Sequence, residues 1–173
     1  NCVTMAEVLG SADYFAAATG KWHLTPDDNP NARVVDRSSW PIQRGFHKFF
    51  GTLPGGGSYF DPKGLMRDNE AIRAVSDFYY TDAISDEAAK LVRRAAELDK
   101  PLFLYVAYTA PHWPLHALEE DIARYRETYA QGWDALREQR HRRMIDMGLV
   151  EQRWKLSPRD HRVPAWENEP NRA

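Results

Sequence analysis

The sequence of 173 residues contains a single cysteine, Cys2, and almost no net charge, with a formal value of −2 at pH 7. One cysteine excludes an internal disulfide and a zinc site built from several thiolates. The balanced charge excludes the overall basic field of nucleic-acid-binding proteins, so no nucleic acid is expected as a partner. No stretch approaches the roughly 20 apolar residues that cross a bilayer, so no membrane partner is expected either.

The hydrophobic content of 43% is enough for a core of ordinary size in one domain. Asn1 is not preceded by a methionine, and a helix signal begins within three residues, so we expect upstream sequence to be missing. Residues 157–173 are rich in proline, asparagine, glutamate and arginine without apolar periodicity, which predicts a truncated, loop-like tail. Residues 1–156 are therefore expected to hold the folded part.

Two apolar runs predict strands that are buried on both faces. Residues 14–18 form the shorter run, for which a helical turn is the alternative, and residues 102–108 form a longer one, which is expected to be central in a parallel sheet. Thr4 and Glu7 have the three-residue spacing of a capping box, which predicts a short helix over residues 5–9.

Helical periodicity recurs in three later segments. Apolar residues between 84 and 98 repeat at intervals of three and four, with Thr81 and Asp82 as candidate N-caps. Residues 119–129 and 133–147 are also predicted to be helical. A helix followed by a buried strand is an α/β unit, so the expected fold is α/β, with a mostly parallel central sheet flanked by helices.

A long loop is predicted from residue 27 to residue 60, where Pro, Asn, Ser and Gly are frequent and several aromatic rings occur. It includes three consecutive glycines at residues 55–57. Neither Lys-Ser nor Lys-Thr follows them, and they do not complete a dinucleotide-binding pattern, so a structural loop is favoured over a phosphate cradle.

The first candidate site is the segment Gly-Lys-Trp-His-Leu at residues 20–24, which follows the shorter predicted strand. In an extended backbone, alternate side chains share a face. Lys21 and His23 are therefore expected to point together into a cleft, while Trp22 turns to the core. A solvated surface lysine or histidine is the common alternative for each residue taken singly.

The second candidate is His112, which lies between Pro111 and Pro114 in the loop after the longer strand. Ligands of open α/β sheets bind beyond the carboxyl ends of the strands, where both segments are expected. His112 and His116 have the spacing of a metal-binding helix, but the proline between them breaks such a helix, so a metalloprotease-type site is rejected.

Four motifs together resemble one family. They are residues 4–9 (Thr-Met-Ala-Glu-Val-Leu), 20–24 (Gly-Lys-Trp-His-Leu), 44–51 (Arg-Gly-Phe, then Phe-Phe-Gly) and 110–115 (Ala-Pro-His-Trp-Pro-Leu). Their order and spacing resemble the arylsulfatase branch of the alkaline-phosphatase-like superfamily. The resemblance implies an α/β sandwich and a sulfuric ester hydrolase with a formylglycine nucleophile and calcium.

The resemblance also implies roles for three residues. Lys21 would contact the sulfate and the nucleophile side chain, and His23 would hydrogen-bond the hydrated formylglycine. His112 would contact the sulfate and the leaving-group oxygen. A lysine offers a compact charge to a sulfuryl group, and an imidazole can donate or accept a proton near neutral pH. These three are the expected catalytic residues, with Lys21 and His112 also binding substrate.

Some family features are missing from the sequence. Cys2 is followed by neither the Pro or Ala nor the Arg of the formylglycine segment, so it is not expected to be the nucleophile. The family's calcium-binding Asp pair and Asp-Asn-Gly are also missing, so the metal ligands are expected outside this segment, which alone should be inactive. Thr25 replaces a family glycine, and His47 replaces an acidic residue.

The expected partners are a small sulfate ester or a sulfated glycan. A phosphoesterase of the same superfamily and a non-catalytic remnant that binds sulfated glycans remain alternatives. Family habit indicates a periplasmic, secreted or lysosomal protein, and the residues themselves leave the location open.

Overall fold

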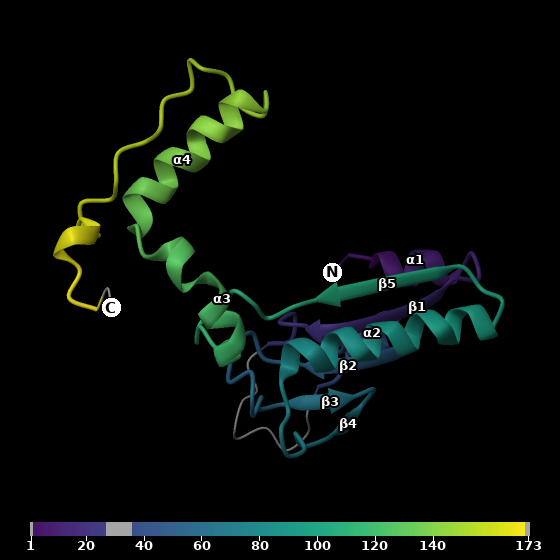
Figure 1. Cartoon of the computed structure of the whole chain (residues 1–173). Helices are drawn as coiled ribbons and strands as arrows, with labels where there is room; N and C mark the ends of the chain where they lie inside the picture. The colour runs from purple at the N-terminus through teal and green to yellow at the C-terminus, as the bar shows by residue number, and fades with distance from the viewer. Residues whose placement is uncertain (1, 27–35, 172–173) are drawn as a thin grey trace. The chain divides into compact units, whose positions relative to one another are not determined.

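The computed structural model describes residues 2–26 and 36–171, which form two compact units that divide between His116 and Ala117. The first unit contains a five-stranded sheet in the order β4-β3-β2-β1-β5 (Figure 1). Its elements are α1 (Met5–Gly10), β1 (Phe15–Lys21), η1 (Pro41–Arg44), β2 (Lys48–Thr52), β3 (Leu65–Arg67), β4 (Glu70–Ala71), α2 (Tyr80–Glu97) and β5 (Leu102–Ala107).

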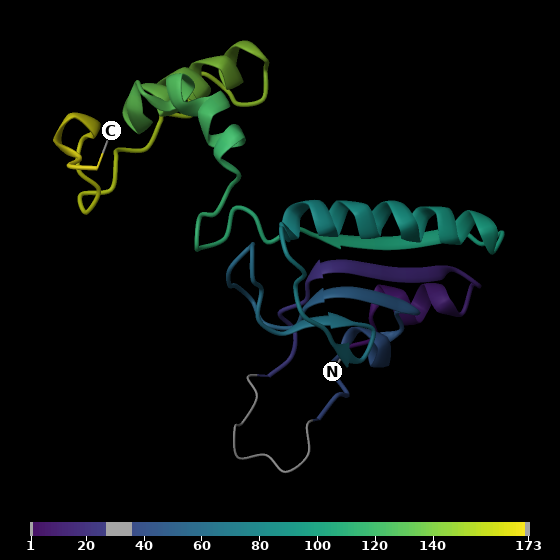
Figure 2. The same cartoon turned by 60° about the horizontal axis from the view of Figure 1, so that its bottom comes forward.

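The three long strands of the sheet run parallel. β1 lies between β2 and β5 and pairs in parallel with both, while β3 and β4 add an antiparallel hairpin beside β2. Helices cover the two faces of the sheet, with α2 on one side and α1 on the other (Figure 2). The expected α/β class with a mostly parallel, helix-flanked sheet is confirmed.

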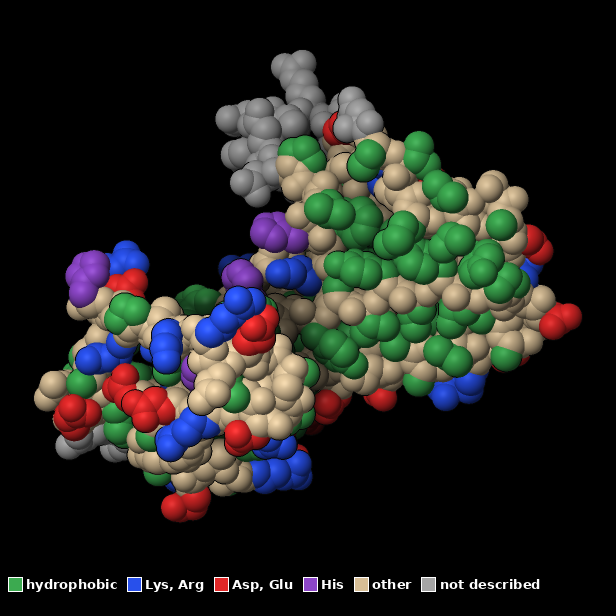
Figure 3. Space-filling view, turned by 90° about the horizontal axis from the view of Figure 1, so that it is seen from above, with side chains coloured by type: hydrophobic (Ala, Val, Ile, Leu, Met, Phe, Trp, Pro, Cys, Tyr) green, Lys and Arg blue, Asp and Glu red, His purple; other side chains and the backbone are tan. Residues whose placement is uncertain are grey.

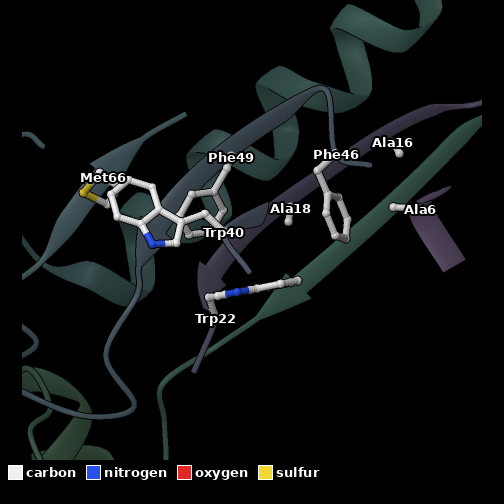
Figure 4. Packing of buried hydrophobic residues seen from close by; sticks show 8 residues of the cluster. All are labelled: Ala6, Ala16, Ala18, Trp22, Trp40, Phe46, Phe49 and Met66. Atoms are coloured by element: carbon white, nitrogen blue, oxygen red, sulfur yellow. The ribbon is translucent and has the colours of Figure 1, made fainter. Parts of the chain in front are cut away.

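The strand β1 is the centre of the first unit because small side chains let helices approach both of its faces. Phe15 and Ala17 pack with Leu91 and Ala95 of α2. On the other face, Ala16 and Ala18 belong to a cluster that includes Ala6 of α1 and several aromatic rings (Figure 4). The predicted strand buried on both faces is therefore confirmed.

The central position that was predicted for β5 is wrong for the strands that the structure describes. β5 pairs with β1 and forms one edge of the sheet, and its Tyr105 and Val106 are 42% and 36% exposed. Hydrophobic side chains gather on one face of the first unit in Figure 3. A strand with apolar side chains on both faces is typically buried on both faces. The sequence of β5 has this pattern, but the described residues leave Tyr105 and Val106 partly exposed.

The prediction of a loop over residues 27–60 is partly wrong. Residues 27–35 lie outside the described part of the chain, and η1 and β2 interrupt the loop in the remainder. Phe49 points into the aromatic cluster with Trp40 and Phe46 (Figure 4), and Phe50 packs in a second cluster with Tyr59 and Tyr80. Tertiary packing of these rings stabilises a strand where turn-forming residues dominate the local sequence.

The capping box predicted at the start of α1 is confirmed. The Glu7 N–H donates to Thr4 Oγ1 at 3.1 Å, and the Thr4 N–H donates to Glu7 Oε2 at 2.6 Å. Arg44 forms an ion pair with Glu7 at 3.1 Å. Gly45 has a φ of +89° and would clash with the backbone of Glu7 if it carried a Cβ. The Arg-Gly-Phe motif therefore locks α1 against the sheet.

The helix α2 was predicted correctly, but its caps were not. Its N-cap is Tyr79, which makes no capping bond with its side chain, and the predicted caps Thr81 and Asp82 lie within the first turn. Tyr80 is buried, and its hydroxyl accepts the Thr52 N–H at 2.7 Å. This bond to the sheet fixes the start of α2 in place of a side-chain cap.

The second unit contains α3 (Glu119–Tyr129), α4 (Gly132–Asp146) and the short η2 (Trp166–Asn168), and the two predicted helices are confirmed. Trp133 and Trp166 pack edge to face with ring centroids 4.8 Å apart. Across residues 2–26 and 36–171, no helix has the length and apolar character that a membrane span requires.

Candidate active site

The carboxyl end of β1 carries Lys21, the last residue of the strand. Gly20 precedes it with a φ of +105°, and a Cβ there would overlap the carbonyl group of Ala107 in β5. Lys21 lies opposite Thr52 of β2 and is half-buried. Its ammonium group has no hydrogen-bond or ion-pair partner among the residues that the structure describes, so its charge is available to a ligand.

Trp22 and His23 continue beside β2 for two more residues. Their N–H groups donate to the carbonyls of Thr52 and Leu53 at 2.9 and 3.0 Å. Trp22 turns into the core, as predicted, and its indole N–H donates to the Ser39 carbonyl at 2.8 Å. The extended backbone assumed for His23 is wrong, since its φ of +52° is left-handed. The strand alternation that was to pair it with Lys21 therefore ends at Trp22.

His112 lies in the segment that follows β5. Its N–H donates to the Thr109 carbonyl at 2.8 Å, and its own carbonyl accepts the Tyr59 hydroxyl at 2.8 Å. The peptide bonds that precede Pro111 and Pro114 are cis. The His112 ring is exposed, and its Nδ1 lies 2.6 Å from the Trp113 carbonyl oxygen.

Each of the two histidines packs against one glycine of the run at residues 55–57. A Cβ built on Gly55 would overlap the His23 ring, and one built on Gly56 would lie 2.9 Å from Cε1 of His112. Consecutive Cα atoms are about 3.8 Å apart, so the two imidazoles pack against neighbouring positions of one loop. His23 and His112 thus both pack against this loop, and Lys21 lies at the same edge of the sheet.

Sequence reasoning treated the glycines at 55–57 as a structural loop and missed their contact with both histidines. The signal was the run itself, because consecutive glycines permit close approach of other groups to the backbone. Tyr59 was also missed. Its hydroxyl bonds to His112, its N–H donates to His116 Nδ1 at 3.3 Å, and burial raises its pKa, so it remains a neutral donor. His116 acts here as a structural acceptor.

The hydrogen bond of His112 selects its tautomer. A carbonyl oxygen only accepts, so Nδ1 carries the proton that is donated to the Trp113 carbonyl. In the neutral ring Nε2 is then unprotonated, and in the imidazolium Nε2–H is a donor. His112 can therefore accept a proton or donate one at Nε2 while its ring orientation stays fixed.

The described residues do not fit a metal ion. Within residues 2–26 and 36–171, no group of three or more His, Cys, Asp or Glu side chains is arranged to hold one. Calcium needs about six to eight oxygen ligands. Cys2 is exposed and free, and it precedes α1, whose first turn holds Glu7.

Comparison with known families shows that residues 1–159 match the Sulfatase family. The chain belongs to the sulfatase family. Membership implies a metal-dependent enzyme class.

Individual relatives agree with this assignment. The chain is 33% identical over 158 residues to an arylsulfatase of Klebsiella aerogenes, covering 85% of this chain and 32% of that protein. It is 31% identical over 164 residues to an uncharacterized sulfatase of Schizosaccharomyces pombe, covering 84% of this chain and 27% of the relative. The chain thus spans about a third or less of the length of these relatives.

A solved structure is also similar. The crystal structure of Ps i-CgsB in complex with k-i-k-neocarrahexaose superposes with a TM-score of 0.58 at 33% identity, covering 69% of this chain and 29% of that one. This likeness agrees with the alkaline-phosphatase-like α/β fold.

Proposed function

We propose that the protein to which this chain belongs hydrolyses sulfate monoesters, and that residues 1–156 form the central part of its catalytic domain, with 157–173 as a tail. The observation that carries the proposal is the packing of His23 and His112 against successive glycines at the carboxyl end of the sheet. Similarity to sulfatases and an arylsulfatase supports this reaction class.

Each side chain has a distinct proposed role. Lys21 has no competing carboxylate among the described residues, so its ammonium binds the sulfuryl oxygens and stabilises the charge that develops on them. His112 donates the Nε2 proton to the leaving oxygen, while Trp113 holds its Nδ1. His23 accepts a proton from the nucleophile residue when sulfate is released.

Two groups of the proposed enzyme come from residues other than those described. A formylglycine would supply a hydrated aldehyde whose oxygen attacks sulfur. The proposed metal is calcium, and because the described side chains do not fit it, no step is assigned to the ion. The proposed substrate is a small sulfate ester or a sulfated glycan, in keeping with the oligosaccharide named for the similar structure.

The test compares leaving groups in the full-length enzyme. His112→Ala should slow an alkyl or sugar sulfate by about 10²–10⁴-fold, the usual contribution of a general acid. It should slow 4-nitrophenyl sulfate much less, because that phenolate leaves with little protonation. Lys21→Ala should slow both substrates to a similar extent, because its charge acts on the sulfuryl group whatever leaves.

Matched controls are available in the second unit. His161, whose side chain is 91% exposed, and the exposed Lys155 should tolerate alanine without loss of rate. If His112→Ala slowed both substrates equally while the fold stayed intact, His112 would bind sulfate without acting as the acid. Turnover of 4-nitrophenyl phosphate but of no sulfate ester would contradict the proposed function in favour of a phosphoesterase.

A further inference from the structure

A cavity of about 300 Å³ lies beside His23 in the first unit. Its wall is largely apolar and includes Trp40, Leu53 and Met66. Small-molecule sites range from about 300 to 1,000 Å³ and combine apolar walls with a few polar groups. The volume therefore suits a single ring. Because His23 borders both this cavity and the glycine loop, a ligand in the cavity would be next to the proposed reaction site.

Asn69 also lines the cavity. Its Oδ1 is closed off from solvent and has no hydrogen-bond partner in the part of the chain that the structure describes. Because this oxygen does not face the open cavity, no ligand contact is assigned to it.

The turn that carries Asn69 is held in place. Asp68 precedes it with a φ of +54°, and its Oδ1 accepts the Phe49 N–H at 2.9 Å. Its Oδ2 accepts from Lys48 Nζ at 2.7 Å. These bonds anchor the β3–β4 turn to β2, so the position of Asn69 does not depend on a ligand.

The cavity also contains a cation. Arg37 lines it, and the guanidinium carbon lies 4.9 Å from the ring centroid of Trp40. Arg37 has no carboxylate partner among residues 2–26 and 36–171. Stacking on an indole fixes the plane of a guanidinium and leaves its N–H groups free, and such a fork matches the oxygens of a sulfate or carboxylate.

We infer that this cavity is a subsite for the alcohol part of the substrate, and that it takes a sugar ring bearing a second anionic group, either sulfate or carboxylate. The apolar wall packs against the ring, and Arg37 binds the second anion. The subsite presupposes the proposed sulfatase activity, because it places that ring beside His23.

The experiment uses the full-length enzyme and a matched set of substrates. They are a monosulfated disaccharide, the same sugar with a second sulfate, the same sugar with a uronate carboxylate, and 4-nitrophenyl sulfate. Arg37→Ala should lower kcat/KM by roughly tenfold or more for the substrates with a second anion. It should change the monosulfated sugar and 4-nitrophenyl sulfate less than about twofold, since neither reaches Arg37 with a charge.

Two further variants separate the subsite from general effects. Arg93→Ala removes an equally exposed cation from α2, outside the cavity, and should leave all four substrates unchanged. Arg37→Gln should reproduce Arg37→Ala, which excludes a packing defect as the cause. A loss for only one of the two doubly anionic sugars identifies the second anion as sulfate or as carboxylate.

The subsite would be refuted if Arg37→Ala changed all four substrates by the same factor, or none of them, while wild type turned over 4-nitrophenyl sulfate. Failure of the proposed function looks different, because wild type would then hydrolyse no sulfate ester at all. In that case calorimetric binding of the disulfated sugar, weakened by Arg37→Ala but not by Arg93→Ala, would still support an anion subsite.

Discussion

The contact between the glycine loop and the two histidines can be tested with single methyl groups. Gly55 and Gly56 both have backbone angles outside the left-handed region, so alanine is acceptable to the main chain at either position. In Gly55→Ala the methyl would occupy the space of the His23 ring. In Gly56→Ala it would lie 2.9 Å from Cε1 and 3.0 Å from Nδ1 of His112.

The size of the effect follows from the displacement. At Gly56 the methyl falls 0.5 Å short of the 3.4 Å at which ordinary contact begins, so the His112 ring must move by about that amount. A misplacement of about 1 Å costs roughly 10²-fold in rate, which predicts a loss of about tenfold for Gly56→Ala. At Gly55 the overlap is larger, and the expected loss is about 10²-fold or more.

The assay is kcat/KM of the full-length enzyme with a sugar sulfate and with 4-nitrophenyl sulfate. Gly56→Ala should reduce the sugar sulfate more, because it disturbs the bond between His112 Nδ1 and the Trp113 carbonyl. Gly10→Ala is the matched control, since a Cβ at Gly10 meets nothing within 4 Å. If both loop variants kept wild-type rates on both substrates, the packing of the histidines on this loop would not be functional.

Three further outcomes are expected. Tyr80→Phe should cost about 1–3 kcal/mol in urea unfolding, because the buried Thr52 N–H loses its acceptor; Tyr105→Phe is the control, and equal midpoints would contradict this reasoning. Burial raises the pKa of Glu87, but the hydrogen bonds and charges of Arg67 and Lys90 together lower it more, to below 4.5. These ion pairs therefore contribute stability above about pH 4.5 that is lost as pH falls through the lowered pKa; Glu87→Gln should flatten this acid dependence of the unfolding temperature, and an unchanged profile would exclude the ion pairs as its cause. The purified 173-residue chain alone should turn over no aryl sulfate; measurable turnover would show that the nucleophile is within it.

Sequence patterns predicted the elements whose signals are local in the chain. The repeat of apolar residues located α2, and the capping box located α1, because both signals lie within one turn or one helix face. The sequence could not predict β2, since its neighbours Pro41 and Gly45 are typical of loops. The strand exists because Phe49 and Phe50 pack on opposite faces of the sheet, against residues distant in the sequence.

The candidate site was predictable in its residues and only partly in its geometry. Lys21 and His112 were placed at the carboxyl ends of their strands by the rule for parallel sheets, and the structure has them there. His23 was placed by strand alternation, which fails because its backbone turns left-handed. Its ring packs instead against the glycine loop, a long-range contact whose sequence signal is the run of glycines at residues 55–57.

The placement of the candidate residues depends on how closely three strands approach one another just before the site. Gly20 lies opposite both Gly51 and Ala107. A Cβ at Gly20 would overlap the Ala107 carbonyl, and one at Gly51 would overlap the Gly20 carbonyl. The next residues of these strands lead to Lys21, to the glycine loop and to the His112 segment. A methyl group at Gly20 or Gly51 would therefore separate all three segments without touching any of the proposed catalytic residues.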